Sequence, residues 1–454
     1  MKLSIHNFKT IRELNGFDFS SINIISGVNS SGKTSFIQFL LMLKQTLEAQ
    51  SANPKLIFDK NLEYEDLVYK KNLNNSIEFE IQFDKKDIQD RFNTSLLQIN
   101  AFVIIAKYSF LNGEVVLSNI SLKYGIESKS NFSSIDFLYK DGRYNVMATD
   151  NLFGNLMPLV EKDEKEDVTI IKNLENGTLS FNSFFPLTFI NAFIGEEVKT
   201  HRIIKFVNDY FSSISYIGPL RAEPNDFYPQ NKKDKQIGKN GEFAAQFLEE
   251  GAKNEVEFYD IENKIIKTML LSEAVKYWIC DYFKLAKNIT AEKENDKYKV
   301  KVINQYDVET TIRQVGFGIS QVLPIIVEGL RMPKGGVLIL EQPEIHLHPK
   351  VQSMLFDFIY SLSLTGKKFV IETHSDHFIT RMRRRVAESN DNLAKQINLM
   401  FVEQEENEHK FVQLDLTNMG TFSYFPDDFV EQAEDDYKAI IKAQAEKRKS
   451  SKKI

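Results

Sequence analysis

Apolar and polar positions follow two different periods along the chain. Residues 3–8 alternate with a period of two and predict a half-buried strand, and residues 22–26 predict a second strand that runs into a turn. Residues 35–47 are strongly apolar over a helical length. The chain is therefore expected to open with strand, strand, loop and helix, so that a loop connects the end of a strand to the start of a helix.

From residue 76 onward the pattern has a period of two over a long segment. The alternation is clearest at four apolar positions, Ile77, Phe79, Ile81 and Phe83. Further strand-like runs follow at residues 102–110, 115–124 and 137–146, and Asp141-Gly142 is typical of a hairpin turn. We expect an antiparallel β lobe over residues 76–150, inserted after the first helix.

The second half of the chain mixes helical and strand patterns. Residues 242–248 and 272–285 predict helices, and the second helix has an apolar face made by Ala274, Trp278 and Tyr282. We therefore expect a helical insertion over residues 225–290. Beyond and before it, strands are predicted at residues 213–217, 298–303, 309–313, 336–340, 369–372, 398–403 and 410–414, and helices at 320–330 and 350–364.

The composition is that of a globular protein, with 42% hydrophobic and 26% charged residues. The net charge of −6 means that any nucleic-acid site would have to be a local basic patch. The single cysteine, Cys280, excludes a disulfide framework and fits a reducing cytosol. Because no segment has the roughly 18 apolar residues of a membrane span or the pattern of a signal peptide, we expect a cytoplasmic protein without membrane contact.

The sequence GVNSSGKT at residues 27–34 matches the phosphate-loop pattern G-x-x-x-x-G-K-[ST]. A strand precedes it and a helix follows, so backbone N–H groups and the helix N-terminus can surround phosphate oxygens. We expect this loop to bind ATP, with Lys33 at the β- and γ-phosphates and the Thr34 hydroxyl on Mg²⁺. The expected nucleotide contacts are Gly27, Asn29, Ser30, Ser31, Gly32, Lys33, Thr34 and Ser35.

Three further motifs lie at the ends of predicted elements. The apolar strand at 337–340 ends in EQPE at 341–344, followed by IHLHP at 345–349. A carboxylate such as Glu341 at a strand end beside a phosphate loop can bind Mg²⁺ together with Thr34. Residues 315–321 (VGFGISQ) precede an apolar helix, of which Ser320 is expected to be the N-cap. The sequence ETHSD at 372–376 follows another apolar strand.

Together with the phosphate loop, these motifs resemble the ABC-type ATPase heads of OLD, RecF and SMC-like proteins. They are more closely similar to the AAA-family ATPases of prokaryotic anti-phage defence systems such as Septu, PARIS and certain retrons. The resemblance covers about residues 1–430, followed by a charged tail at 431–454. It implies an α/β P-loop NTPase of ABC-ATPase head type, with the antiparallel β lobe and the helical insertion as additions.

The resemblance also implies a homodimer with two shared ATP sites. His374 would contact the γ-phosphate, and Ser320 of the opposite subunit would bind the same phosphate in trans. One position departs from the family pattern, because Gln342 occupies the place of the general base, and a glutamine cannot accept a proton. Either hydrolysis is slow, or Glu344 supplies the carboxylate. The expected catalytic residues are Glu341, Gln342, Glu344 and His374.

Two hypotheses for the function follow from this resemblance. The first is an ATP-dependent dimeric sensor or scaffold that controls a partner effector, a nuclease, in anti-phage defence. The alternative is a protein that acts on nucleic acid itself, as OLD and RecF do. Residues 375–454 are too few for the nuclease domain of OLD-type proteins, and no heptads interrupt the head, which favours the first hypothesis. Ser320 and His374 disfavour a small-molecule kinase, which has no use for them.

Other clusters admit more than one interpretation. A basic cluster that is either a solvated helix face or a contact to DNA or RNA is formed by Arg381, Arg383, Arg384 and Arg385. Arg221, after a Gly-Pro turn, is either a contact to nucleotide or partner, or a surface arginine. A zinc site is the competing interpretation for four histidines, His346, His348, His374 and His377, although both pairs lie where an ABC head needs them.

Overall fold

The computed structural model describes residues 1–27, 32–51, 54–58, 62–89, 99–126, 133–141, 143–149, 160–162, 168–174, 181–186, 197–232, 236–389, 393–404, 408–422, 424 and 444. Three expected nucleotide contacts, Asn29, Ser30 and Ser31, lie outside these residues. The expected charged tail at 431–454 also lies outside them, apart from residue 444.

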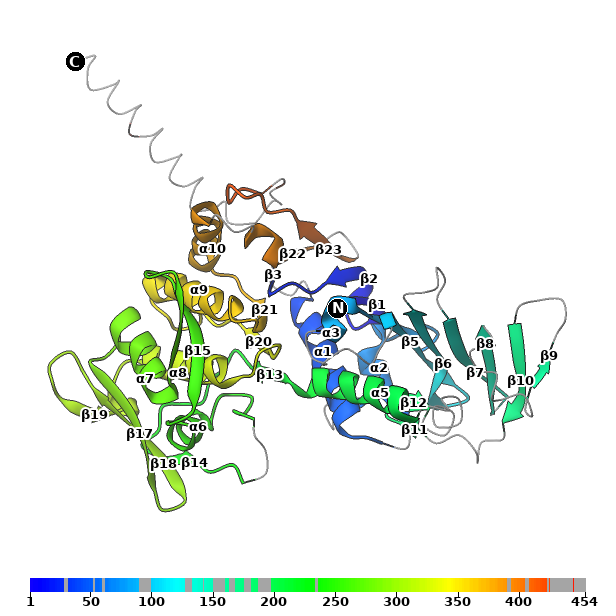
Figure 1. Cartoon of the computed structure of the whole chain (residues 1–454), viewed down its shortest axis with the longest axis horizontal. Helices are drawn as coiled ribbons and strands as arrows, with labels where there is room; N and C mark the ends of the chain where they lie inside the picture. The colour runs from blue at the N-terminus through cyan, green and yellow to red at the C-terminus, as the bar shows by residue number, and fades with distance from the viewer. Residues whose placement is uncertain are drawn as a thin grey trace, which may run out of the picture.

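A parallel sheet occupies the middle of the molecule (Figure 1). Among the described strands its order is β13, β20, β21, β3, β22, β23, and β23 alone runs antiparallel to its neighbour. The strands are β3 (Ile22–Gly27), β13 (Ile214–Ile217), β20 (Val337–Glu341), β21 (Lys368–Glu372), β22 (Ile397–Gln404) and β23 (His409–Leu414). Every residue of β3 and β20 is buried, because the sheet is covered on both faces. This explains the apolar run 337–340 of β20 and the three isoleucines of β3.

The side chains of the parallel strands divide between two hydrophobic cores. Leu338 and Leu340 of β20 pack in one core with α8 (Phe317–Arg331) and α9 (Pro349–Ser363). Val337 and Ile339 pack in the other core with α1 (Lys33–Glu48) and α5 (Glu197–Ser212). Because successive side chains of a strand point to opposite faces, one short apolar run serves both cores and holds the sheet rigidly between them.

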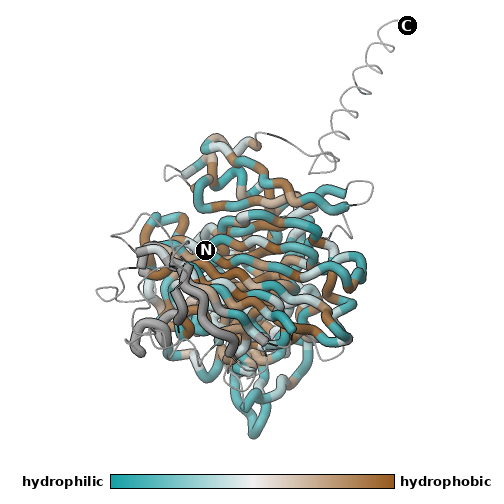
Figure 2. Tube along the Cα trace, turned by 90° about the vertical axis from the view of Figure 1, so that its right-hand side faces the viewer, coloured by the Kyte–Doolittle hydropathy of each residue, from teal (hydrophilic) through white to brown (hydrophobic). Residues whose placement is uncertain are grey.

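An antiparallel sheet packs against α1 from the other side. Phe39 of α1 contacts Phe8 and Phe79 edge to face, so this helix lies between the two sheets. Among the described strands the order is β2, β1, β4, β5, β6, β7, β8, β10, β9. Their bounds are β1 (Lys2–Phe8), β2 (Ile11–Asp18), β4 (Ile77–Asp84), β5 (Ile99–Leu111), β6 (Glu114–Ile126), β7 (Ser133–Lys140), β8 (Arg143–Thr149), β9 (Val160–Lys162) and β10 (Val168–Leu174). Figure 2 shows apolar and polar positions alternating along the strands.

The strands expected at 76–150 therefore belong to a larger sheet. This sheet also contains β1 and β2 from the N-terminus and β9 and β10 from beyond residue 150. The sequence analysis missed β2, which supplies Ile11, Leu14 and Phe17 to the core at a spacing of three residues. That spacing resembles a helical period, and a bulge between β1 and β2 allows the strand to bury it.

The expectation of a helical insertion over residues 225–290 is wrong for much of its length. The segment contains α6 (Ala244–Glu250), α7 (Leu271–Lys276) and the π-helix η3 (Tyr277–Tyr282), but a hairpin of β15 (Glu255–Asp260) and β16 (Ile265–Leu270) separates them. A further sheet is formed by β14 (Tyr228–Pro229), β17 (Asn288–Glu294), β18 (Lys297–Ile303) and β19 (Glu309–Thr311). The hairpin escaped the pattern analysis because Ile265 and Ile266 are both exposed, so β16 has no apolar alternation.

The start of α8 also corrects an expectation. Gly316 is the N-cap, and Ser320 is already inside the helix, in its first turn. The strand expected at 309–313 ends at Thr311, where a 3-10 turn begins. The remaining elements are α2 (Tyr64–Leu67), η1 (Tyr69–Lys71), α3 (Lys85–Gln89), β11 (Phe181–Asn182), β12 (Phe185–Pro186), η4 (Ile312–Gln314), α10 (Asp376–Glu388) and η5 (Leu393–Gln396). Within the described part of the chain, no helix has both the length and the apolar character to cross a bilayer.

Candidate nucleotide-binding site

The carboxyl ends of three parallel strands bring the sequence motifs to one edge of the sheet. β3 precedes the phosphate-loop sequence, β20 ends at Glu341, and β21, which lies between them, ends at Glu372. α1 begins on the same side with Lys33 and Thr34. Ligands of open α/β sheets bind outside the carboxyl ends of the strands, so this edge is the candidate site.

Lys33 opens α1 and is almost fully buried. Its ammonium group donates a hydrogen bond to the carbonyl oxygen of Gly27, 3.1 Å away. Burial lowers the pKa of Lys33, and the charge of Glu372 acts in the opposite direction. Because part of the ammonium's dehydration has already occurred on folding, less remains to be lost when it binds a phosphate.

Glu372 is a site residue that the sequence analysis did not select. Thr34 Oγ1 donates a hydrogen bond to Glu372 Oε2 over 3.2 Å, and Glu372 pairs in register with Glu341. Burial and then the charge of Glu341 raise the pKa of Glu372 to about 7. Burial likewise raises the pKa of Glu341, despite a hydrogen bond from Tyr216. The signal that could have found Glu372 is its place directly after an apolar strand, the same place that Glu341 has.

The donors gathered here are those that a hard divalent cation uses. Two carboxylates and one hydroxyl, from Glu341, Glu372 and Thr34, meet between the strand ends and the start of α1. Mg²⁺ is usually bound by one or two carboxylates, with phosphate oxygens and water completing its shell. A cation would also offset the repulsion by Glu341 that, after burial, raises the pKa of Glu372.

Gln342 and Glu344 lie in the turn after β20, and both are tied to the end of β21. Gln342 has a left-handed backbone with φ of 43°, and its N–H donates to the Glu372 carbonyl oxygen at 2.8 Å. Glu344 is buried, and its Oε1 accepts the N–H of His374 at 2.7 Å. Burial raises the pKa of Glu344. Both residues proposed from the sequence to handle water therefore stand at the site.

His374 lies at the exposed rim of the site, just before α10. Ser375 caps that helix, because its hydroxyl accepts the N–H of Phe378 at 3.1 Å. Partial burial of the ring, and then the charge of Lys33, lower the pKa of His374. The imidazole is therefore neutral at pH 7 and can donate one hydrogen bond to a phosphate oxygen.

Thr10 and His409 come from distant parts of the chain and lie against the start of α1. Thr10 Oγ1 is 2.8 Å from Ser35 Oγ, and the His409 ring lies 3.8 Å from where Gly32 would carry a Cβ. A Cβ on Gly32, which has φ of 90°, would overlap the Thr10 hydroxyl. No sequence motif marks Thr10 or His409. Only the fold reveals that the β1–β2 turn and β23 lie beside Gly32 and the start of α1.

Ser320 is less accessible than its expected role in trans requires. It is 4% exposed in the isolated chain, within the first turn of α8. Gly316, the N-cap, is exposed, whereas Ser320 is buried. The expected contact of Ser320 with a nucleotide in trans therefore stays a prediction.

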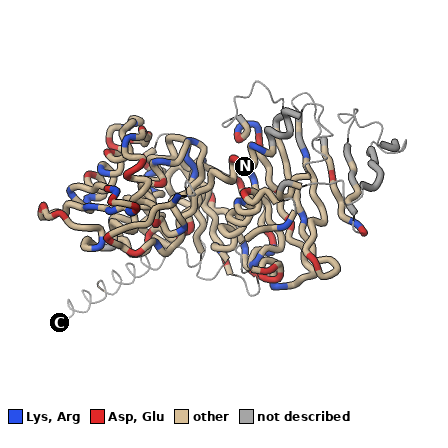
Figure 3. The backbone as a smooth tube through the Cα atoms, turned by 90° about the horizontal axis from the view of Figure 1, so that it is seen from below, with Lys and Arg blue, Asp and Glu red and all other residues tan. Residues whose placement is uncertain are grey.

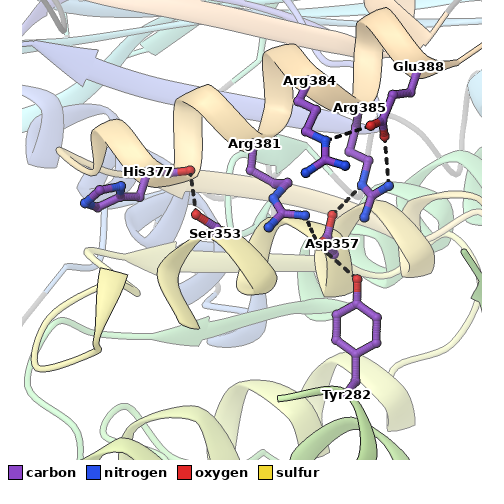
Figure 4. Close-up of polar contacts among 8 residues, drawn as sticks. All are labelled: Tyr282, Ser353, Asp357, His377, Arg381, Arg384, Arg385 and Glu388. Carbon is purple, nitrogen blue, oxygen red and sulfur yellow. Dashed lines mark hydrogen bonds and ion pairs between the residues drawn. The ribbon is translucent and has the colours of Figure 1, made fainter. Parts of the chain in front are cut away.

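The basic cluster of α10 is organised around one buried carboxylate (Figure 4). Asp357 of α9 has no exposed surface. It accepts a hydrogen bond from Arg385 at 2.6 Å, pairs with Arg381 at 3.2 Å, and accepts the Tyr282 hydroxyl at 2.9 Å. The network thus joins α10 and α9 to the π-helix η3. An internal anion of this kind explains two of the four arginines without any external partner.

The other two arginines of this cluster also have partners in the chain. Arg384 donates to Glu388 at 2.6 Å, and Arg383 Nε donates to the Gly420 carbonyl oxygen at 2.9 Å. Arg383 further stacks over the ring of Phe422. Figure 3 shows Lys and Arg positions mixed with Asp and Glu positions along the described chain. The arginines of the cluster therefore hold α10 against the rest of the chain.

Two of the four histidines considered for zinc make other contacts in the described part of the chain. His348 caps α9, since its Nδ1 accepts the N–H of Lys350 at 3.3 Å. The carbonyl oxygen of His377 accepts the Ser353 hydroxyl at 3.3 Å. Among the described residues, no group of three or more His, Cys, Asp or Glu side chains is arranged to hold a metal ion.

The family to which the chain is similar is consistent with an ATP site at this edge of the sheet. The model of the AAA ATPase domain family matches residues 1–379, and the chain belongs to this family. It is therefore an ATP-binding P-loop ATPase, and the expected α/β fold class with an antiparallel sheet is confirmed. A search of curated proteins returned no match.

Three of the solved structures similar to this chain are heads of SMC proteins. One is an SMC head bound to the C-winged helix domain of ScpA, with 13% identity over 91% of this chain and 98% of that chain, and a TM-score of 0.40. Another is the SMC head of Thermotoga maritima, with 11% identity over 91% and 98% of the two chains and a TM-score of 0.35. A third, derived from Pyrococcus furiosus, has an extended coiled coil and is bound to the C-terminal domain of ScpA, with 13% identity, 91% and 96% coverage and a TM-score of 0.40.

Proposed function

We propose that this ATPase is a slowly hydrolysing, Mg²⁺-dependent homodimeric switch that controls a partner effector, a nuclease, in anti-phage defence. The observation that carries the nucleotide part is the meeting of Lys33, Thr34, Glu341 and Glu372 at one edge of the parallel sheet. The regulatory and defence parts follow from the resemblance of the motifs to defence ATPases.

Mg²⁺ would be held by Thr34, Glu341 and Glu372 together with the phosphates. The ion would supply charge neutralisation between the β- and γ-phosphates when bound. Lys33 would bind the same phosphates from the helix end, and the neutral His374 would donate to the γ-phosphate from the rim. Together these residues would orient the terminal phosphate toward the 342–344 turn.

Slow turnover follows from Gln342 if no other base replaces it. Glu344 is the competing base, because it is two residues farther along the same turn and buried at the site. Single-turnover hydrolysis separates the two. If Gln342 limits the rate, Gln342→Glu accelerates cleavage by roughly 10- to 100-fold. If Glu344 is the base, Glu344→Gln abolishes cleavage and Gln342→Glu changes little, which contradicts the slow switch.

Dimerisation around ATP is the second part of the proposal. The first turn of α8 would face the nucleotide of the other copy, with Ser320 reaching the γ-phosphate after that turn opens. Light scattering should show a monomer with ADP and a dimer with ATP and Mg²⁺, because the proposed slow cleavage keeps ATP bound during the measurement. A mass that stays monomeric with ATP argues against the shared site.

The effector is tested in the native genetic context. The chain is purified together with the products of its neighbouring genes, and phage plating is measured with wild-type protein and with Lys33→Met. A co-purifying nuclease and a loss of protection in the variant support the proposal. Nuclease activity of the purified chain alone would instead support a protein that acts directly on nucleic acid.

A further inference from the structure

Arg221 is a buried cation at the nucleotide site, so the interpretation as a surface arginine is wrong. It follows β13 and is 7% exposed. One terminal nitrogen, Nη1, donates to the carbonyl oxygens of Pro219 at 2.7 Å and Gln342 at 3.1 Å. β13 is the parallel neighbour of β20, which places the turn after β13 beside the turn after β20. Arg221 thereby holds the backbone of the left-handed residue Gln342.

The rest of the guanidinium group has no hydrogen-bond partner among the described residues. Both Nε and Nη2 are buried without a hydrogen-bond partner, and Oε2 of Glu344 is also buried without one. Two carboxylates act on Arg221 as opposite charges, that of Glu344 more strongly than that of Glu341. A buried cation with open donors beside a buried anion with an open acceptor leaves room for a polar bridge, such as a water molecule or a ligand oxygen.

The turn that carries Arg221 is braced against α8. The N–H of Gly218 donates to the Lys239 carbonyl oxygen and the N–H of Ala222 donates to that of Asn240, each at 2.8 Å. The next residue, Gly241, lies so close to α8 that a Cβ there would overlap the ring of Pro324. The turn that carries Arg221 is thus linked through residues 239–241 to α8, the helix whose first turn is proposed to face the second copy.

We propose that Arg221 is a positioning residue for ATP hydrolysis. It holds the backbone of Gln342 and faces the carboxylate of Glu344, so that the 342–344 turn keeps the geometry from which it orients the attacking water. This inference rests on the proposed roles of Gln342 and Glu344. Arg221 acts through the turn, and the affinity for ATP is set by Lys33 and the phosphate loop.

The test compares Arg221→Met and Arg221→Lys with wild type, using kcat for ATP hydrolysis and calorimetric Kd for ATP with Mg²⁺. Misplacement of reacting groups lowers rates by roughly 10- to 100-fold, and we expect such a loss of kcat in Arg221→Met with Kd within about threefold. Lysine keeps the charge but lacks the planar fork, so Arg221→Lys should fall between wild type and Arg221→Met.

A double variant distinguishes positioning from a general loss of structure. If Arg221 acts through the turn that holds Glu344, adding Arg221→Met to Glu344→Gln lowers kcat by less than about twofold, since the two groups act as a unit. Arg331→Met is the matched control. Arg331 is a half-buried arginine that pairs with Glu328 and stacks on Phe247, far along α8, and its removal should leave kcat unchanged.

Three results overturn the inference. The first is a kcat of Arg221→Lys equal to that of wild type. The second is a loss of ATP affinity, in either single variant, as large as the loss of kcat in that variant. The third is a kcat of the double variant that reflects the full, additive losses of both substitutions. If Arg221→Met does not fold, Arg221→Lys decides alone. If the wild-type protein hydrolyses no ATP at all, the proposed function fails first, and this result is seen before any variant is made.

Discussion

Glu341 and Glu372 are register partners at the carboxyl ends of β20 and β21. Neighbouring parallel strands place such residues on the same edge, about one strand spacing apart, which is roughly 4.8 Å. Both carboxyl groups are buried, and burial is the largest cause that raises the pKa of each. The fold therefore holds two like charges together at the point where a cation and a triphosphate are proposed to bind.

The first prediction concerns the pH dependence of stability in the absence of divalent cations. The pKa of Glu372 is about 7 in the folded chain and 4.5 as its ordinary value. The folded state therefore keeps a proton between these values that the unfolded state loses, so stability falls as pH rises from about 4.5 to 7. Removing the group should make Glu372→Gln more stable than wild type by roughly 3 kcal/mol at pH 8 and about equal at pH 4.5.

Urea unfolding at both pH values, with EDTA present, measures this difference. Adding Mg²⁺ and ATP at pH 8 should reverse the order, because a ligand that binds only the folded wild type stabilises it by mass action. A difference between the two proteins that stays constant from pH 4.5 to 8 contradicts the assignment of a raised pKa to Glu372.

The second prediction separates Lys33 from another buried lysine of the same helix. Lys33→Met should weaken ATP binding by roughly 10- to 100-fold, the equivalent of one lost hydrogen bond to a charged group. Lys44 pairs with Glu48 at 2.6 Å and lies away from the strand ends, so Lys44→Met should leave Kd unchanged. Isothermal titration with ATP and Mg²⁺ measures both. Equal affinities in wild type and Lys33→Met would mean that the phosphate loop does not bind ATP.

The third prediction concerns the network that fastens α10. Asp357→Ala leaves two cations without their buried anion and should lower the free energy of unfolding by roughly 3–5 kcal/mol. Arg384, whose side chain is 60% exposed, pairs only at the surface, so Arg384→Ala should change it by less than about 1 kcal/mol. Guanidinium unfolding of both variants gives the comparison. Similar values for the two would show that Asp357 is not the anchor of the cluster.

The fourth prediction tests the contact between the Arg221 turn and α8. Gly241 and Gly113 both have positive φ, but a Cβ would overlap Pro324 at Gly241 and meets nothing within 4 Å at Gly113. Gly113→Ala should lose only the roughly 1–2 kcal/mol of a left-handed alanine. Gly241→Ala should lose about 1–3 kcal/mol more from overpacking. Thermal or urea unfolding measures the difference, and equal losses mean that the turn and the helix are not in close contact.

The sequence analysis located buried strands well and exposed ones poorly. The runs at 22–26 and 337–340 correspond to β3 and β20, because a strand buried on both faces is mostly apolar. β16 has two adjacent exposed isoleucines and no such pattern. The error at Ser320 was of another kind: the sequence contains several residues that suit a helix start, and the observed start is four residues earlier.

The amino-acid sequence by itself determined the chemistry of the phosphate loop, the acidic end of β20 and the class of fold. These are local signals, in which residue type and spacing along a few positions carry the information. The tertiary structure alone decided that Glu372 pairs with Glu341, that Arg221 is buried over the 342–344 turn, and that α10 is held by Asp357. Such relations depend on strand order and on contacts between segments far apart in the chain, which no local pattern encodes.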